Sequence, residues 1–172
     1  MRKSTRWFSV LAVFVLAGAA VVGLSAANFF TCGPSGGTGG TYFTDDQTAG
    51  RYSSDNRRLS EVRVRSGIYI DAIQTVYVNS VGQTFTSPWH GGKGGALSVF
   101  KLDPDEYIVR VNGKHGWFID HLEIVTNKGR MKGWGGTGGQ RSFIYTAPQG
   151  AQIISFFGYC GDYLDAVGVS LK

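Results

Sequence analysis

The sequence lacks several patterns that define large classes of proteins. Beyond residue 30, no stretch of helical length carries an apolar stripe with a period of 3.6 residues, which excludes a helical fold. The 26 glycines follow no Gly-X-Y period, so a collagen-like chain is excluded. There is no Asn-X-Ser/Thr sequence, and N-glycosylation is therefore not expected. Since 42% of the residues are hydrophobic and 13% are aromatic, the composition can supply a core and does not indicate disorder.

Patterns typical of an enzyme or a metal site are also scarce. His90, His115 and His121 do not have the spacing of metal ligands, and we expect them in loops and in one strand. Lys93 lies inside a run of glycines, but no Ser or Thr and no helix follows it as in a P-loop. A glycosidase needs two carboxylates on opposite sides of one sugar, whereas the repeats described below supply one each, apart from Asp162. We therefore expect no catalysis, no cofactor and no metal.

The first 27 residues have the composition of a secretory leader. Arg2, Lys3 and Arg6 precede an apolar run from Trp7 to Leu24, and small residues that suit cleavage follow it. This predicts a signal peptide over 1–27 and a secreted, extracellular protein, with an uncleaved apolar N-terminal helix that anchors the chain in a membrane as the alternative. Cleavage lowers the formal net charge from +5 to +2, so the basic character gives little support for binding nucleic acid.

Only two cysteines, Cys32 and Cys160, are present. In an exported chain this number predicts one disulfide, which would join the N-terminal part of the domain to its C-terminal part. Two free or buried thiols are the alternative. We expect a short linker over 28–34 and one domain over 35–172.

Two short motifs each occur three times. GxxxD occurs as GIYID, GWFID and GDYLD at residues 67–71, 116–120 and 161–165. GGxGG occurs as GGTGG, GGKGG and GGTGG at residues 36–40, 91–95 and 135–139. Two different motifs in triplicate indicate an internal threefold repeat, whose units must pack on one another because one unit cannot bury its own apolar face.

Between the motifs the sequence predicts short strands. Alternation of polar and apolar residues over 59–66 is typical of a half-buried strand, and the β-branched and aromatic segment 69–78 predicts its antiparallel partner. An entry strand is expected around the first GGxGG within 28–58, followed by a loop, and the remaining strands are expected at 84–87, 96–102, 107–111, 118–126, 130–133, 142–146, 152–159 and 163–171. Because turns that contain glycine separate them and no helix intervenes, the sequence predicts an all-β barrel or prism.

The two motifs together favour a sugar-binding site. In GxxxD, glycine opens a loop whose N–H groups are free of strand pairing, and the aspartate can turn its carboxylate toward them. Acceptors and donors then lie close together, as the hydroxyls of a pyranose require, while an aromatic residue (Tyr69, Phe118 or Tyr163) can contact the sugar's C–H groups. GGxGG has no Cβ at four positions, so a ligand can approach its main chain closely. One copy of GxxxD is a weak signal, because glycine and aspartate also serve ordinary turns; three copies are a strong one.

With these motifs, the chain resembles the jacalin-type lectins over about residues 35–172. The segments DEYI (105–108), TNKGR (126–130), FFG (156–158) and LDAVGV (164–169) are also similar to that family. Within the family, the chain is most similar to a red-algal member whose three GxxxD loops are intact. The resemblance implies an all-β fold of the β-prism I type, with three four-stranded antiparallel sheets related by pseudo-threefold symmetry. It also implies mannose binding without a metal, in which the aspartate accepts from sugar hydroxyls and loop amides donate.

Carried over by position, the resemblance implies three sites. The first comprises Asp71 with Ile68, Tyr69 and Gly95, the second Asp120 with Trp117, Phe118 and Gly139, and the third Asp165 with Asp162, Tyr163 and Gly40. The second site departs from the pattern, because phenylalanine replaces tyrosine and a bulky tryptophan precedes it. The glycine-rich loop near the N-terminus is internal to this chain, which favours mannose or glucose over galactose.

We therefore expect a lectin that binds mannose-containing glycans or glycoproteins. The alternative is an adhesion module that binds no glycan and uses the fold only as a scaffold. We expect no nucleic-acid partner, and contact with a membrane only through an uncleaved leader. A homodimer formed by an edge strand is consistent with the family but is not specified by the sequence.

Overall fold

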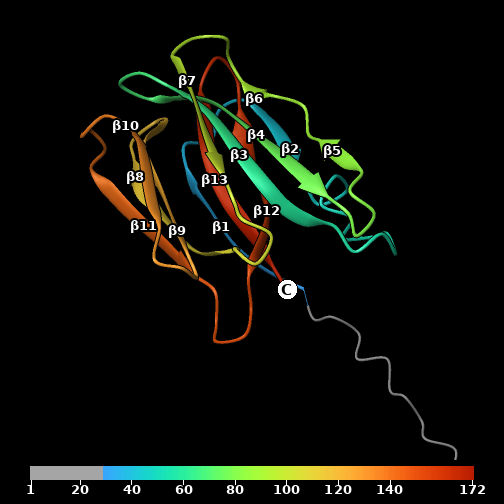
Figure 1. Cartoon of the computed structure of the whole chain (residues 1–172). Coiled ribbons are helices and arrows are strands. Elements are labelled where there is room, and N and C mark those ends of the chain that lie inside the picture. The colour runs from blue at the N-terminus through green and yellow to red at the C-terminus, as the bar shows by residue number, and fades with distance from the viewer. Residues whose placement is uncertain (1–28) are drawn as a thin grey trace, which may run out of the picture.

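The computed structural model describes residues 29–172, and the expected leader lies outside that part of the chain. The described chain is all-β and contains no helix, and hence no helix that could cross a membrane (Figure 1). Its strands are β1 Phe30–Gly36, β2 Thr41–Thr44, β3 Arg58–Ser66, β4 Ile70–Val78, β5 Thr84–Thr86, β6 His90–Gly91, β7 Ala96–Lys101, β8 Ile108–His115, β9 Ile119–Thr126, β10 Met131–Gly135, β11 Arg141–Thr146, β12 Ile153–Cys160 and β13 Leu164–Leu171.

Hydrogen bonding joins these strands into two sheets, not the three that were expected. The larger sheet has eight strands in the order β1-β13-β12-β8-β9-β10, with β2 also paired to β12 and β11 to β8. The smaller has five, in the order β5-β4-β3-β7, with β6 also paired to β4. In the larger sheet, one residue pair, Ile153 with Ile108, joins β12 to β8. The eight strands therefore fall into two groups of four, β1-β13-β12-β2 and β11-β8-β9-β10, and each group resembles the smaller sheet in its antiparallel pairing.

Strand β1 begins at Phe30, inside the segment expected to be a linker. It pairs antiparallel with β13, from Phe30 opposite Leu171 to Gly36 opposite Ala166. Figure 1 shows this pairing as a blue strand beside a red one at the C-terminal end of the chain. Residues 30–34 are therefore part of a sheet. An entry strand was expected around the first GGxGG, but its start at Phe30 was not, because this segment shows no alternation of hydrophobic and polar residues.

The expected disulfide is absent, and Cys32 and Cys160 are both free. In the larger sheet Cys32 lies opposite Val169, while Cys160 lies opposite Leu164. These positions are five residues apart along β13, or about 17 Å at the usual rise of a strand. Disulfide geometry requires Cα atoms within about 7 Å, so the sheet holds the two thiols too far apart. The two cysteines do belong to one group of strands, on β1 and β12 at either side of β13, but at different levels.

The core lies between the three groups of strands and takes its residues from one face of each. In β3 the alternation predicted from the sequence is found, since Val62 and Val64 are fully buried while Arg63 and Arg65 are half-buried. The centre is formed by large fully buried side chains, which include Ile70, Tyr77, Ile108, Ile119, Leu122, Phe156 and Leu164. Ile70, Ile119 and Leu164 are the first residues of β4, β9 and β13 and directly precede the GxxxD aspartates. Packing of the core therefore fixes the strand ends on which those aspartates lie.

Candidate functional site

The three GxxxD aspartates occupy the same position in three strands. Asp71, Asp120 and Asp165 are each the second residue of their strand, β4, β9 and β13. In each copy the first three residues of GxxxD, directly before the strand, form a bend. A hydrogen bond from the N–H of the glycine to the carbonyl of the third motif residue closes this bend. These bonds measure 3.0 Å for Gly67 to Tyr69, 3.0 Å for Gly116 to Phe118 and 2.9 Å for Gly161 to Tyr163. The sequence motif thus forms one local structure three times.

The glycine-rich loops lie directly against these aspartates, in the pairs expected from the sequence. In each pair the N–H of the loop's second glycine donates to the main-chain carbonyl of the aspartate: Gly92 to Asp71 at 2.9 Å, Gly136 to Asp120 at 2.9 Å and Gly37 to Asp165 at 2.8 Å. The third pair joins the N-terminal loop to the last strand. The chain therefore closes into a ring of three equivalent contacts.

The last glycine of each GGxGG loop faces the carboxylate and has no room for a side chain. An added Cβ would lie 2.5 Å from the Oδ2 of Asp71 at Gly95, 3.0 Å from that of Asp120 at Gly139 and 2.6 Å from that of Asp165 at Gly40. All three glycines also have positive φ angles, between 69° and 81°. Both the conformation and the close approach therefore require glycine at this position.

The first glycine of GxxxD has a different explanation. Gly67, Gly116 and Gly161 do not have positive φ, and an added Cβ would lie 3.9, 3.7 and 3.7 Å from the Oδ2 of the aspartate, which is ordinary van der Waals contact. The backbone thus does not require glycine here. Because glycine has no side chain, the space over the carboxylate stays open.

The carboxylates are almost buried and have no charged partner. Asp71, Asp120 and Asp165 are 8%, 7% and 6% exposed. Within residues 29–172 no side chain donates a hydrogen bond to them, and none forms an ion pair with them. Such buried groups usually have partners, because removing a carboxylate from water is costly. The burial exceeds what the sequence suggested, and it leaves a narrow opening at each acid.

At Asp165 this cost is reflected in the pKa. Burial raises the pKa of the Asp165 carboxyl above its ordinary value of 3.8, and the N–H groups of Gly161 and of Asp165 itself oppose the rise only in part. Its Oδ2 atom is buried without a hydrogen-bond partner in the described chain. A ligand hydroxyl that donates a hydrogen bond to Oδ2 would remove the cost of leaving this atom unpaired.

Donors for a ligand lie beside each acid. The second and third residues of each bend are outside the strands, and their N–H groups make no hydrogen bond in the described chain; they are Ile68 and Tyr69, Trp117 and Phe118, and Asp162 and Tyr163. Each site therefore offers a carboxylate acceptor next to two free amides. This is the arrangement that the sequence analysis expected from GxxxD.

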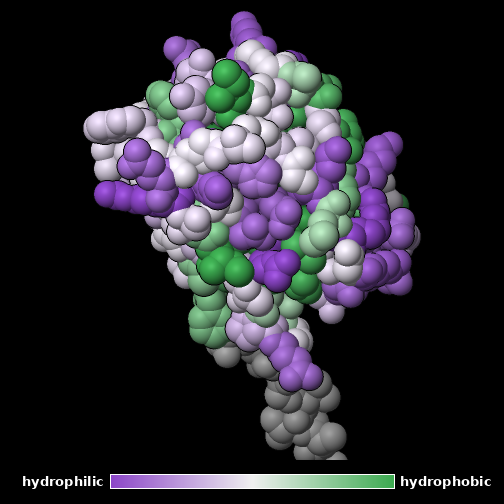
Figure 2. Space-filling model, turned by 90° about the vertical axis from the view of Figure 1, so that its left-hand side faces the viewer, coloured by the Kyte–Doolittle hydropathy of each residue, from purple (hydrophilic) through white to green (hydrophobic). Residues whose placement is uncertain are grey.

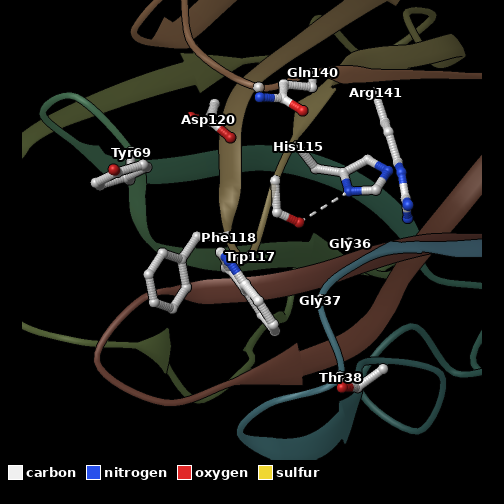
Figure 3. Close-up of a pocket in the computed structure, with 12 residues that line it drawn as sticks. Gly36, Gly37, Thr38, Tyr69, His115, Trp117, Phe118, Asp120, Gln140 and Arg141 are labelled. Carbon is white, nitrogen blue, oxygen red and sulfur yellow. Dashed lines mark hydrogen bonds between the residues drawn. The ribbon is translucent and has the colours of Figure 1, made fainter.

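A hollow of about 550 Å³ lies at Asp120 (Figure 3). In the figure Trp117 and Phe118 lie on the side opposite Asp120 and Gln140, and the main chain at Gly36 and Gly37 forms a third wall. Trp117 is 82% exposed and forms a raised rim. The two residues that depart from the family pattern, Trp117 and Phe118, thus line the space in front of the acid.

The aromatic residues of the three bends contact one another. The ring centroids of Tyr69, Phe118 and Tyr163 lie 5.6, 5.4 and 4.9 Å apart in the three pairs. Tyr69 and Phe118 also line the hollow at Asp120. The rings therefore join the three sites at their centre, and only part of each ring is available to a ligand, which is less than the sequence analysis expected.

Each glycine-rich loop also borders a second site. Gly37 lies against the main chain of Trp117, Gly92 against that of Asp162, and Gly136 against that of Ile68, where its N–H donates at 2.9 Å. Sequence spacing did not reveal this, because it depends on the order of the loops around the ring. The hollow at Asp120 is also lined by His115, Gln140 and Arg141, which the sequence analysis did not assign to a site. They lie next to the motifs in the sequence.

Nothing in the described chain has the geometry of a catalytic site. The chain was expected to contain no hydrolase motif GxSxG, but residues 33–37, GPSGG, formally match it. Ser35 lies in strand β1, however, where its Oγ accepts a hydrogen bond from the Tyr145 hydroxyl at 2.7 Å, and no helix follows it as a nucleophile turn requires. A buried pair of Asp45 and His90 has no serine or cysteine positioned as a nucleophile; the Asp45 carboxylate accepts from Thr75. No group of three or more potential metal ligands occurs in residues 29–172.

An all-β chain with three repeated acid-and-glycine sites on one ring defines a lectin-like protein. The family model for the jacalin-like lectin domain matches residues 32–170, and the chain belongs to that family. It is 34% identical to horcolin from Hordeum vulgare over 119 residues, or 64% of this chain and 80% of horcolin. It is 31% identical to human zymogen granule membrane protein 16 over 138 residues, or 80% and 77% of the two chains.

Solved structures show the same fold. The Malaysian banana lectin matches with a TM-score of 0.70 at 27% identity, over 84% of this chain and 99% of the lectin. The mannose-binding lectin from champedak matches with a TM-score of 0.71 at 28% identity, over 86% and 99%. Artocarpin in complex with mannotriose matches with a TM-score of 0.71 at 26% identity, over 85% and 99%. The described chain thus has the all-β fold of the jacalin-related lectins and is a carbohydrate-binding protein of that family.

Proposed function

We propose that this lectin binds mannose- or glucose-type glycans without catalysis and without a metal, through up to three GxxxD and GGxGG sites. The observation that carries the proposal is the repeated burial of a carboxylate that has no partner side chain and lies beside two free amides. The mannose-binding lectins among the structural relatives support the choice of sugar. We also infer that the three groups of four strands form a β-prism with pseudo-threefold symmetry.

The chemistry of one site follows from its donors and acceptors. The carboxylate accepts hydrogen bonds from two neighbouring sugar hydroxyls, and bonds to an ionised acceptor are about twice as strong as neutral ones. The free amides of the bend donate to the ring oxygen or to a third hydroxyl. The loop glycines allow the sugar to approach the main chain, and no metal is needed to complete its hydrogen bonds.

A single site of this kind is small and open, so we expect a dissociation constant in the millimolar range, or about −4 kcal/mol. Three sites on one ring can engage branches of one glycan. Linked binding of this kind raises the overall affinity by about 10² to 10⁴ without any new contact, provided that the branches span the sites.

Single substitutions of the three aspartates test the proposal. Asp71→Asn, Asp120→Asn and Asp165→Asn keep the size of the side chain but remove its charge and one acceptor. We expect each to weaken methyl α-mannoside binding at its own site by at least tenfold in a titration followed by NMR, with the melting temperature maintained. Asp105→Asn is the matched control, because Asp105 is exposed and pairs with Lys128 in a distant turn. Unchanged binding in all three variants would contradict the proposal.

Secretion is a second part of the proposal and rests on the leader composition alone. We expect the mature chain to begin after about residue 27 and to appear in the culture medium, which N-terminal sequencing of the secreted protein would show. Recovery of the intact chain in the membrane fraction would favour the anchor instead. A homodimer stays a prediction, to be checked by light scattering.

A further inference from the structure

The outer face of the β11-β8-β9-β10 group carries a hollow, lined by apolar surface together with charged and polar side chains, that the proposed sugar sites do not use. Its volume is about 390 Å³, within the usual range of ligand pockets. The residues that line it are Arg110, Asn112, Gly113, Lys114, His121, Ser142, Phe143 and Ile144. Figure 2, which looks from the side on which β10, β8 and β11 lie in Figure 1, shows hydrophilic residues gathered in the middle of this face with hydrophobic ones near them.

Strand register explains how these side chains come together. Lys114 lies opposite Ser142 on one side and His121 on the other, and Asn112 lies opposite Ile144 and Glu123. Because side chains alternate between the two faces of a sheet, Arg110, Asn112 and Lys114 of β8 project outward, whereas Ile108, before the irregularity in the strand, is buried. On the edge strand Gly133 contributes no side chain, and the half-buried His121 ring lies against it.

The side chains at the hollow carry a net positive charge. Among the described residues, Arg110 and Lys114 form no ion pair, and no lining residue is acidic. The one carboxylate that faces this region from a neighbouring strand, Glu123, accepts a hydrogen bond from the Asn112 side chain at 3.2 Å. On a fully solvated strand face the polar atoms would contact water, whereas two polar atoms on this face are buried.

Two polar atoms at the hollow are buried and have no partner in residues 29–172. They are the Nε of Arg110, a donor, and the Oδ1 of Asn112, an acceptor. Leaving a buried donor or acceptor unpaired is unfavourable, so a ligand that pairs with these atoms would bind more tightly. The hollow therefore suits a ligand that carries both anionic groups and hydroxyl donors.

The spacing of the cations indicates the size of that ligand. Arg110 and Lys114 are four residues apart on one strand, so their Cα atoms lie about 13 Å apart. One small anion is too short to span that distance, whereas an acidic sugar chain has anionic groups at intervals with hydroxyls between them. Asn112 lies between the cations and Ser142 lies beside Lys114, where both can bond such hydroxyls, while the exposed Ile144 beside Asn112 can contact sugar C–H groups. We propose that this hollow is a second binding site, which takes an acidic oligosaccharide bearing sulfate or carboxylate groups.

The test uses a sulfated dextran oligosaccharide as the probe and the unsulfated oligosaccharide as its control. We expect the full chain to bind the sulfated probe, as measured by fluorescence polarisation, and the double variant Arg110→Gln/Lys114→Gln to weaken that binding at least tenfold. The matched control is Arg58→Gln/Lys101→Gln, which removes the same charge from the other sheet and should change binding less than twofold. Equal losses in the two double variants would overturn the proposal, because net charge alone would then explain binding.

Three further arms distinguish this site from the mannose sites. The triple variant Asp71→Asn/Asp120→Asn/Asp165→Asn should keep its affinity for the sulfated probe, and saturating methyl α-mannoside should not displace the probe. Displacement by mannoside, or loss in the triple variant with the fold intact, would overturn a separate site. Displacement by inorganic sulfate more than by sodium chloride of equal ionic strength would show a simple anion site and would also overturn the proposal. Binding of the uronate-containing oligosaccharide alginate, with no binding of the sulfated probe, would restrict the ligand to carboxylates.

Discussion

The Oδ2 atom of Asp165 is buried without a hydrogen-bond partner, and it faces Gly40, where an added Cβ would lie 2.6 Å from it. These two residues are 125 positions apart and belong to the two ends of the domain. Their contact closes the ring of three sites, which makes the last strand and the first glycine-rich loop parts of one candidate site. The same relationship is found at Asp71 and at Asp120 with their own loops.

The first prediction separates two glycines of this site. Gly161→Ala should leave the unfolding free energy within about 1 kcal/mol of the original, because the backbone there does not need positive φ and the new methyl group meets only ordinary contacts. The methyl group would nevertheless cover the Asp165 carboxylate and should abolish sugar binding at that site. Gly40→Ala should lower both the unfolding free energy and the affinity for sugar. At Gly40 φ is +74° and the methyl group would collide with the carboxylate, so we expect the unfolding free energy to fall by at least about 1–2 kcal/mol. Urea unfolding and mannoside titration check both variants, and Gly150→Ala, in an open turn, is the control for strain alone.

The second prediction concerns pH. Burial raises the pKa of Asp165, so the folded state holds this proton more tightly than the unfolded chain. Its contribution to the unfolding free energy is therefore greatest below about pH 3.8, the ordinary value, and is lost as the pH rises through the raised pKa. Asp165→Asn removes that dependence, so the stability of this variant relative to the original should increase with pH and then level off. Urea unfolding at a series of pH values measures this, and a difference that declines with pH would refute it.

The same raised pKa predicts how binding responds to acid. Sugar binding at this site uses the ionised carboxylate, so affinity should fall as the pH is lowered, beginning above pH 3.8 because the pKa is raised. A pH titration of mannoside binding, read at the amides of 162 and 163, checks this. Binding that stays constant down to the ordinary carboxyl pKa would show that the charge of Asp165 is not used.

The third prediction concerns the cysteines. Because the sheet holds Cys32 and Cys160 about 17 Å apart along β13, no bond should join them in the folded protein. The unreduced protein, once unfolded, should react with two equivalents of a thiol reagent, and a reducing agent should not shift the melting temperature. A peptide map with the two cysteines linked would contradict the strand register described here.

The fourth prediction concerns the buried Asp45 and its partner His90, which directly precedes the second glycine-rich loop. Asp45 is fully buried and contacts the Nε2 of His90 at 2.7 Å, while Phe43 stacks on the His90 ring at 4.1 Å. Asp45→Ala would leave His90 and Thr75 without their partner and should cost about 3–5 kcal/mol of stability. His90→Ala should loosen the loop at Asp71 and weaken that site, while the Asp120 site in the same molecule is unaffected and acts as the control. Equal weakening of both sites would indicate a global effect.

Local sequence patterns predicted the strands and the pairing of the motifs better than the way the sheets join. The alternation around Val62 and Val64 predicted β3, and the resemblance to the jacalin-type lectins implied which glycine-rich loop meets which aspartate. The entry strand expected around the first GGxGG begins earlier than predicted, because FTCGPSG has no alternation and the place of β1 is set by pairing with β13 far along the chain. The disulfide prediction failed for the same reason, since cysteine spacing contains no information on strand register.

At the site, the sequence identified the acids but not their surroundings. That the aspartates would be nearly buried follows from their place as the second residue of a core strand, which only the fold determines. The sharing of Gly37 between the site at Asp165 and the wall beside Trp117 depends on the order of loops around the ring. The hollow on the outer face likewise combines residues from separate strands, and no single stretch of sequence marks it.

The most direct test of the central claim is the change in amide NMR shifts of the labelled protein as methyl α-mannoside is added. The account predicts that the N–H signals of residues 68, 69, 117, 118, 162 and 163 move together with those of the adjoining glycine-rich loops, and that each aspartate-to-asparagine variant silences only its own group. Shifts confined to other surfaces, or shifts at these amides that persist in all three variants, would contradict it.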